Sequence, residues 1–341
     1  MRSSGSPQSI LGLFGGPGFL LVCLLVVGIA GAIAYLALSG GRGSAGSATI
    51  KLPGGGVPQA QGTSQDTSST AGATQLQSMP AAPVAKEISV GFAIEEDLSP
   101  TELLAKYPPD PGAALEEGDG SLPAWQRFGR QSTVSPQSPR VALLITGLGR
   151  NRVDTVRAIT GSPPETSLSF AADTPDLSAW TAAARAFGHE AFIDLPLDQP
   201  ADPDGLATGR PPEENLRRLD QMLARAPMVA GIAVSGSEPF LADAAALQPI
   251  LKHARGLGLA VIGLPVTAPL TVAADETIVS DATQTAIGRS IETVMALAQR
   301  RGAALGVVDS TSAATLFPAW RRALVGRDEI SLVPATALVE E

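Results

Sequence analysis

Short apolar segments alternate with longer amphipathic segments from residue 140 to the end of the chain. Continuous apolar segments of about four to eight residues are typical of buried parallel strands, and apolar residues that recur every three to four positions are typical of helices. The predicted strands cover residues 141–145, 166–170, 191–195, 229–234, 260–264, 276–279, 304–308 and 330–333. The predicted helices cover residues 152–159, 177–187, 212–225, 242–255, 283–301 and 313–324. This alternation predicts an α/β fold with a parallel sheet, either open or closed into a barrel.

Residues that favour helix ends mark several of these boundaries. Asp176 precedes one predicted helix as a candidate N-cap, and Pro211 opens another that has acidic residues in its first turn. Gly188, Gly256 and Gly302 fall just past predicted helix ends, where the backbone favours a left-handed residue. We therefore expect all three glycines to adopt positive φ.

The N-terminal part of the chain contains a candidate membrane segment. Residues 19–38 include no charged residue and are almost entirely apolar, and twenty helical residues span about 30 Å, the thickness of a bilayer core. We predict a short tail at 1–18 followed by a single-pass anchor at 19–38; the alternative is a signal peptide cleaved near residues 32–34. The short tail and the large soluble part favour an inner-membrane protein whose soluble domain is periplasmic.

Two further segments separate this anchor from the predicted sheet. Residues 39–84 are rich in Gly, Ser, Ala, Thr, Pro and Gln, a composition typical of a flexible, disordered linker. Residues 85–139 form a predicted lead-in strap, partly ordered, with one short helix at 100–107. Trp125 and Phe128 are candidates to pin this strap onto the domain at 140–339.

Composition excludes several classes of function. The net charge of −9 argues against nucleic-acid binding, which needs clustered Lys and Arg, and aromatic residues make up only 4% of the chain. Cys23 is the single cysteine, so an intramolecular disulfide is impossible. The two histidines, His189 and His253, are too few for a three-histidine zinc site. We predict a structural role for His189, ahead of its strand, and a solvated surface position for His253.

The segment RVALLITGLGR at residues 140–150 is the clearest buried strand and its following loop. Loops at the carboxyl ends of strands hold the chemistry in α/β folds, yet Thr146, Gly147, Leu148 and Gly149 include no acid and no histidine. The Gly-x-Gly in this loop lacks the third glycine of a dinucleotide fingerprint, because residue 152 is Arg152. The sequence predicts a well-formed scaffold whose site lacks its usual charged groups.

The order of these segments resembles the divergent polysaccharide deacetylase family over residues 140–339. The resemblance rests on the first strand with its closing Leu-Gly, on FGHE at 187–190 followed by DLPLD at 194–198, on the strand end at 231–240, and on the last two strands at 303–316 and 332–338. Trp125 to Phe128 also resemble the family's lead-in. The resemblance implies a deformed (β/α) barrel of the polysaccharide deacetylase type.

The resemblance also implies metal-assisted amide hydrolysis, in which a divalent ion held by one Asp and two His activates water. The family's paired acids after the first strand correspond to Thr146 and Gly147, and its third-strand histidine corresponds to Asp194. Its fourth-strand histidine, fifth-strand acid and late histidine correspond to Ser235, Gly263 and Ser310. We therefore expect Thr146, Gly147, Ser235, Asp309 and Ser310 to line a substrate cleft, with no metal or other cofactor.

The acidic residues left near this edge are Asp194, Asp198, Asp281 and Asp309. Asp194 and Asp198 are the candidate catalytic residues, as an acid/base pair or as oxygen ligands; the alternative for Asp198 is a polar loop entry. Ser235 is no nucleophilic serine, because the chain lacks a G-x-S-x-G motif there and a plausible histidine base. Arg217, Arg218 and Arg225 beside Asp220 are predicted to form a solvated helix face.

Three functions follow from this reading. The first is a membrane-anchored cell-envelope protein that binds or processes carbohydrate and is degenerate at the metal site, with an envelope polysaccharide or an envelope protein as its partner. The second is an active hydrolase with a carboxylate-only site built from Asp194, Asp198 and Asp309, which would use a divalent metal. The third is an interaction scaffold without catalysis.

Overall fold

The computed structural model describes residues 96–198, 205–234, 238–264, 269–278 and 282–340. The predicted tail, membrane anchor and linker at 1–18, 19–38 and 39–84 lie outside this part of the chain. Within the described ranges, no helix is both long enough and apolar enough to cross a membrane. The description below concerns the compact unit of residues 82–341.

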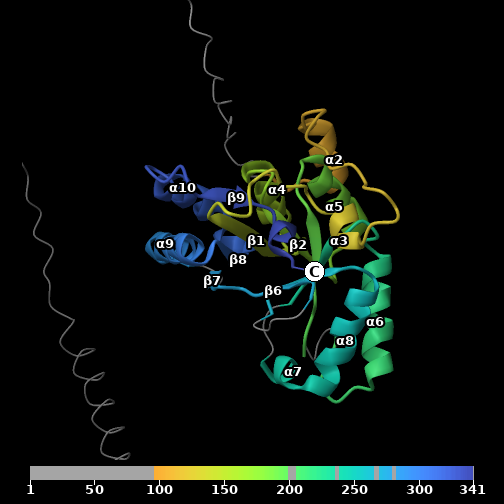
Figure 1. Ribbon diagram of the computed structural model, residues 1–341. Coiled ribbons are helices and arrows are strands. Elements are labelled where there is room, and N and C mark those ends of the chain that lie inside the picture. Colours follow the sequence, from red (N-terminus) through yellow and green to blue (C-terminus); the bar gives the residue numbers. More distant parts are fainter. Residues whose placement is uncertain (1–95, 199–204, 235–237, 265–268, 279–281, 341) are drawn as a thin grey trace, which may run out of the picture. The chain divides into compact units, whose positions relative to one another are not determined.

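The described residues form a nine-stranded sheet in which all pairs of neighbouring strands are parallel (Figure 1). The strands are β1 (Arg140–Leu148), β2 (Ser167–Ala171), β3 (Ala191–Asp194), β4 (Gly231–Ala233), β5 (Ala260–Ile262), β6 (Thr271–Val272), β7 (Glu276–Ile278), β8 (Ala303–Asp309) and β9 (Ser331–Val333). Their order is β6-β5-β4-β3-β2-β1-β8-β7, and β9 pairs with β1. The predicted parallel α/β class is confirmed, and β6 is an additional strand that the apolar pattern did not predict.

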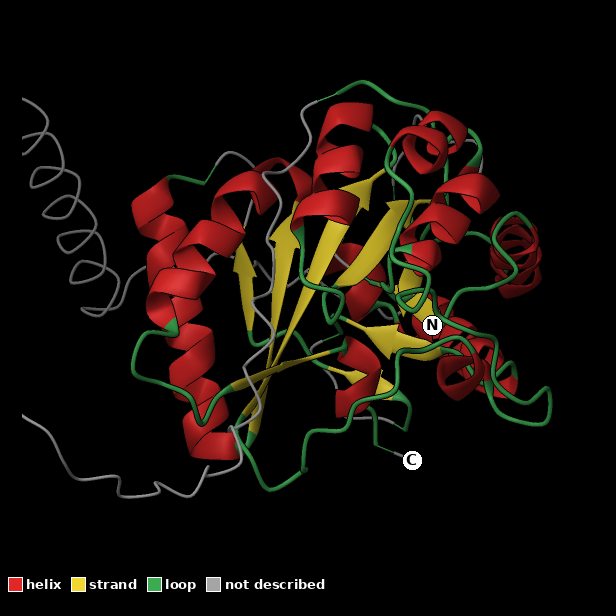
Figure 2. Ribbon diagram, turned by 90° about the horizontal axis from the view of Figure 1, so that it is seen from above, coloured by secondary structure: helices red, strands yellow, loops and turns green. Residues whose placement is uncertain are grey.

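The sheet is curled into a half-barrel. Strands β6 and β7 stand at the two ends of the strand order, yet only residues 273–275 connect them. Because an extended chain spans at most about 3.6 Å per residue, the two ends of the sheet cannot lie far apart. The fan of strands in Figure 2 shows this curvature. The prediction of a (β/α) barrel is therefore confirmed in a form that stays open between β6 and β7.

Helices connect the strands and cover the outside of the curl. They are α4 (Arg152–Gly161), α5 (Leu177–Ala186), α6 (Pro212–Ala224), α7 (Glu238–Ala242), α8 (Ala244–Gly256), α9 (Gln284–Arg301) and α10 (Ala313–Ala323). The lead-in contributes α2 (Pro100–Lys106) and α3 (Ala124–Arg127), and two 3₁₀ turns, η1 (Ser310–Ser312) and η2 (Ala335–Leu338), follow β8 and β9. The predicted helices are confirmed, including the short one at 100–107, and α7 is additional.

The alternation of side chains along β1 separates two hydrophobic cores. Val141, Leu143 and Ile145 pack in the large core beneath the outer helices. Ala142 and Leu144 pack in a smaller core on the concave side. The continuous apolar run of β1 is therefore explained by the outer helices on one face and by the barrel interior on the other.

The lead-in and the C-terminal residues fill this concave core. Phe128 is buried there, and Trp125 packs against the same cluster, as predicted for the residues that pin the strap. Arg185 of α5 donates hydrogen bonds to the carbonyl oxygens of Phe128 (2.5 Å) and Leu115 (3.1 Å), which holds the lead-in against the barrel. The predicted strap is thus an integral part of the domain over its described residues.

Two predicted helix boundaries differ from the structure. Asp176 precedes α5 but has φ of 53° and its side chain makes no capping hydrogen bond, so its predicted role as a side-chain cap is wrong. Gly188 and Gly302 adopt the expected positive φ, of 91° and 86°. Gly256 instead ends α8, and the left-handed residue is Gly258, with φ of 67°.

A buried carboxylate closes the amino edge of the barrel. Strand β8 pairs with one side of β1. On the other side, β9 pairs with the first residues of β1 and β2 pairs with the later ones, so the sheet forks where β2 begins. Glu190 fills the fork and accepts hydrogen bonds from Ser167 Oγ (2.6 Å), Thr336 N (3.1 Å), Thr336 Oγ1 (2.5 Å) and Arg130 N (3.1 Å). With four donors the fully buried carboxylate is satisfied without an ion pair, and it ties the C-terminal turn η2 to the barrel.

Candidate active site at the carboxyl edge

The carboxyl ends of β1, β2, β3 and β8 meet at one edge of the half-barrel. Thr146 lies opposite Asp309 in the register of β1 and β8, and Ala171 lies opposite Asp194 in that of β2 and β3. The register of β1 against β2 shifts between Ile145 and Leu148. Such a bulge re-aims the backbone at a strand end.

Asp194 is the central polar residue of this edge. Its Oδ2 accepts a 2.6 Å hydrogen bond from the backbone N–H of Gly147, and its Oδ1 accepts a 2.6 Å hydrogen bond from Ser169 Oγ. Ser169 comes from β2, in the middle of the buried strand. Asp194 therefore ties the ends of three neighbouring strands together.

The surroundings of Asp194 shift its acidity. Burial raises the pKa of Asp194 above the ordinary value, and the hydrogen bonds from Ser169 and Gly147 only partly offset this. Arg150 also lowers the pKa of Asp194, and the carboxylate of Asp309 raises it.

Gly147 allows the loop after β1 to approach β8 closely. It has φ of 76°, which favours glycine, and a Cβ at this position would lie 3.5 Å from Ser310 Oγ and 3.8 Å from Asp309 Oδ2. Thr146 Oγ1 donates a 3.4 Å hydrogen bond to the carbonyl of Val308. Four residues predicted to line the cleft, namely Thr146, Gly147, Asp309 and Ser310, thus lie together at one edge.

The predicted acidic residues separate into two groups. Asp309 shares the edge with Asp194, although its Oδ1 accepts hydrogen bonds from Thr311 N (3.0 Å) and Thr311 Oγ1 (2.7 Å). Asp198 instead accepts hydrogen bonds from Thr208 N (2.7 Å) and Thr208 Oγ1 (3.1 Å), and its φ is 47°. Asp198 therefore holds the loop after β3, which agrees with the alternative prediction of a polar loop entry. It does not pair with Asp194. Ser235 and Asp281 lie outside the described residues.

A pocket of about 310 Å³ opens at the same edge, between the loops that follow β1 and β2. Arg150, Asp173 and Trp180 are among its lining residues, and Arg150 forms an ion pair with Asp173 at 3.5 Å. We call it the rim pocket, defined by Pro100, Gly149, Arg150, Arg152, Asp173, Thr174, Pro175, Asp176 and Trp180. Sequence reasoning missed Ser169 and Arg150; the alternating serines of the predicted strand at 166–170 were the available signal for Ser169.

The model of the divergent polysaccharide deacetylase family matches residues 143–339 of this chain. The chain belongs to the divergent polysaccharide deacetylase family. The match covers more than half of the chain and includes every strand from β2 to β9. The family membership predicted from the resemblance is thereby confirmed.

Two solved structures resemble this member of the family. An uncharacterized protein from Agrobacterium tumefaciens C58 has 26% sequence identity and a TM-score of 0.59, over 66% of this chain and 98% of that one. The catalytic domain of a peptidoglycan N-acetylglucosamine deacetylase from Eubacterium rectale ATCC 33656 has 10% identity and a TM-score of 0.40, over 62% and 96% of the two chains. No curated protein matches this sequence.

The described residues at this edge do not supply the one Asp and two His that the resemblance implies for a divalent ion. Asp194 and Asp309 lie there, but His189 and His253 lie elsewhere. Across the described ranges, no group of three or more His, Cys, Asp or Glu side chains is placed to hold a metal ion.

Gly263, which the resemblance aligns with the family's fifth-strand acid, has no room for a side chain. Its φ is 98°. A Cβ there would lie 2.5 Å from the carbonyl oxygen of Val234, which is closer than a Cβ atom approaches a backbone oxygen in proteins. The backbone therefore excludes an aspartate at this position unless β4 or β5 moves.

The remaining sequence candidates lie away from this edge. His189 is buried at the amino end of β3, where its ring nitrogens lie 3.0 Å from the carbonyl oxygens of Thr166 and Ile159. His253 is only half-exposed and its Nε2 lies 2.6 Å from Asp220 Oδ1, so its predicted solvated position is wrong. Arg225 is also no part of a solvated face, because it donates hydrogen bonds to the carbonyls of Ala172 (2.6 Å) and Thr174 (2.8 Å).

Proposed function

We propose that this chain is a cell-envelope protein that binds polysaccharide at the carboxyl edge of its half-barrel and has a degenerate metal site. The observation that carries the proposal is the arrangement around Asp194, which is held by Gly147 and Ser169 rather than by a metal-ligand set. Membership of a polysaccharide deacetylase family supports a carbohydrate ligand.

The rim pocket supports binding of a sugar unit at this edge. Its volume of about 310 Å³ is at the lower end of the range for small-ligand pockets. The half-exposed side chains of Arg150 and Asp173 offer a charged donor and a charged acceptor for hydroxyl groups. Asp194, with its raised pKa, stands beside the same loop and would be a further partner for a bound sugar.

We propose that residues 19–38 anchor the protein in the inner membrane, with residues 96–340 on the periplasmic side. The apolar, uncharged composition of the segment supports this placement. A periplasmic domain would meet envelope polysaccharide directly.

An active hydrolase is the second candidate, since Asp309 lies near enough to Asp194 for its carboxylate to raise the pKa of Asp194. It would need ligands other than Asp198, whose carboxylate is engaged by Thr208. A scaffold without glycan contact is the third, and burial of Leu148, Leu197 and Phe240 in the core favours it over a metal enzyme.

Calorimetry on the full chain separates these functions. We expect N-acetylglucosamine oligomers to bind, with affinity at least about fivefold weaker in Arg150→Ala and unchanged in Arg217→Ala, which alters an exposed arginine of α6. We expect zinc, cobalt and manganese to show no binding that Asp194→Ala abolishes. Metal binding that this variant abolishes would support the hydrolase instead. If neither the sugar oligomers nor the metal ions bind, the result would support the scaffold.

A further inference from the structure

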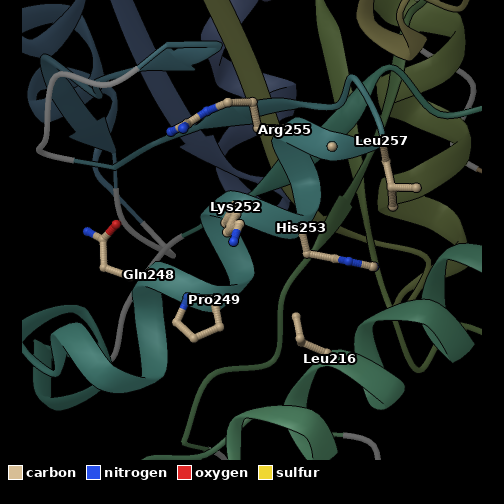
Figure 3. Close-up of a pocket in the computed structure, with 8 residues that line it drawn as sticks. Leu216, Gln248, Pro249, Lys252, His253, Arg255 and Leu257 are labelled. Carbon is tan, nitrogen blue, oxygen red and sulfur yellow. The ribbon is translucent and has the colours of Figure 1, made fainter.

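A second hollow lies away from the carboxyl edge. It has a volume of about 880 Å³ and lies between α6 and α8, in the outer helical layer. We call it the α6–α8 groove; it is defined by Leu216, Gln248, Pro249, Lys252, His253, Arg255, Gly256 and Leu257 (Figure 3). It belongs to neither the rim pocket nor the site around Asp194.

The groove combines an apolar surface with unpaired cations. Leu216, Pro249 and Leu257 supply apolar surface, and Leu257 is 47% exposed, which is unusual for a large apolar side chain among the described residues. Lys252 and Arg255 form no ion pair with any residue that the structure describes. Apolar surface with a charged rim is the composition of a protein-binding site.

The acidic side chains nearby do not neutralise these two cations. Asp220 of α6 is engaged by His253, which lines the groove together with Leu216 (Figure 3). Glu214 is engaged by Arg218 at 3.0 Å, with Arg210 and Arg217 at 3.9 and 4.0 Å. The charge available to a partner along α8 is therefore positive.

The lining favours a peptide over a sugar. No Phe, Tyr or Trp side chain lines the groove, so a sugar ring would lack the large aromatic face on which sugars usually stack. Pro249 lies inside α8 and has no N–H, so the helix lacks one backbone hydrogen bond at the wall of the groove. Two neighbouring helices with an apolar floor between them form the kind of surface that accepts a third, amphipathic helix.

We propose that the α6–α8 groove binds an acidic amphipathic segment of a partner protein, with the apolar side chains of the segment against Leu216 and Leu257 and its carboxylates against Lys252 and Arg255. The apolar contacts supply most of the affinity, and the two cations speed association and select an acidic partner. This surface would recruit a protein independently of any ligand at the carboxyl edge.

The test uses the full chain in a non-ionic detergent and three fluorescein-labelled probes of equal length. One is a helical peptide of Leu, Ala and Glu with Leu on one face, the second has Lys in place of each Glu, and the third is polyglutamate. We expect anisotropy to show binding of the first peptide only. We expect Lys252→Glu/Arg255→Glu to weaken that binding at least about tenfold, and Leu257→Ala to weaken it about fivefold.

A matched control is Arg321→Glu/Arg322→Glu, which makes the same charge change at exposed positions of α10. The proposal is overturned if both double variants weaken binding equally, if the basic peptide or polyglutamate binds as tightly as the acidic helix, or if no probe binds. It is also overturned if sedimentation shows a dimer that Lys252→Glu/Arg255→Glu dissociates, because the occupant is then a second copy of this chain.

Discussion

The backbone N–H of Gly147 donates a 2.6 Å hydrogen bond to Oδ2 of Asp194, which joins the end of β1 to the end of β3. The hydroxyl of Ser169 donates a second hydrogen bond to the same carboxylate. The carboxyl edge is therefore held in shape by hydrogen bonds from neutral donors. These hydrogen bonds determine how variants at the edge should behave.

Replacement of Asp194 by alanine should destabilise the domain. The N–H of Gly147 and the hydroxyl of Ser169 would both lose their acceptor, at a cost of about 1–3 kcal/mol in the free energy of unfolding. Urea denaturation of wild type and variant measures this difference. An unchanged midpoint would show that water replaces the carboxylate without cost.

Asp194→Asn should change the pH dependence of stability. The raised pKa of Asp194 means that its contribution to stability is fully present at acidic pH, below the unfolded pKa, and is lost as pH rises through the folded pKa. Asparagine can accept from Gly147 and donate to Ser169, and it has no charge to bury. The melting temperature of the variant relative to wild type should therefore rise between pH 4 and pH 8. A difference that stays flat over this range would contradict the burial of a charge at this site.

His189 should have the opposite pH dependence. Burial lowers the pKa of His189, so the folded state resists protonation that the unfolded chain accepts. The stability it contributes is present above the unfolded pKa and is lost as pH falls below it. His189→Gln should flatten the loss of stability between pH 7.5 and pH 5, whereas His253→Gln, at a half-exposed position, serves as the control. Equal flattening in both variants would assign the effect to another group.

Glu190 should be the most costly carboxylate to remove. Glu190→Ala leaves four donors without an acceptor inside the barrel, so we expect a loss of about 3–5 kcal/mol. The control is Glu292→Ala, which breaks the exposed pair with Arg327 and should cost less than about 1 kcal/mol. Similar losses in the two variants would rule out the buried network as a main source of stability.

Restoring the family's acid at position 263 should fail. Gly263→Asp combines a positive φ with a Cβ 2.5 Å from the carbonyl of Val234, and we expect a loss of about 2–4 kcal/mol. Gly302→Ala also places a side chain at positive φ, but nothing lies within 4 Å of its Cβ, so the loss should be about 1 kcal/mol. Comparable losses would show that backbone strain alone, and not the contact with Val234, excludes the acid.

The sequence predicted the parts of this fold that depend on long local patterns. The apolar run of β1 and the apolar run that ends at Asp194 predicted the positions of β1 and β3. Strand β6 has two residues, too few for any pattern to emerge, and its existence depends on pairing with β5. Length therefore explains why one strand was predicted and the other was not.

The missed and mistaken site residues depend on contacts between distant segments. Ser169 gains its role from Asp194, twenty-five positions later, and Asp198 loses its predicted one to Thr208. The close approach of Val234 to Gly263 is likewise a tertiary contact that no local pattern reports. Residue types could be predicted at this edge, but not their partners.

The hydrogen bonds between Glu190 and Thr336 have a consequence for synthesis of the protein. The fork of the sheet is filled by residues 331–338, which the ribosome makes after all the other described strands. Until these residues emerge from the exit tunnel, Glu190 lacks two of its donors and β1 lacks a neighbour beside its first residues. Completion of the barrel therefore waits for the synthesis of residues 331–338, and a nascent chain stalled before residue 331 would expose an unfinished core to chaperones and proteases.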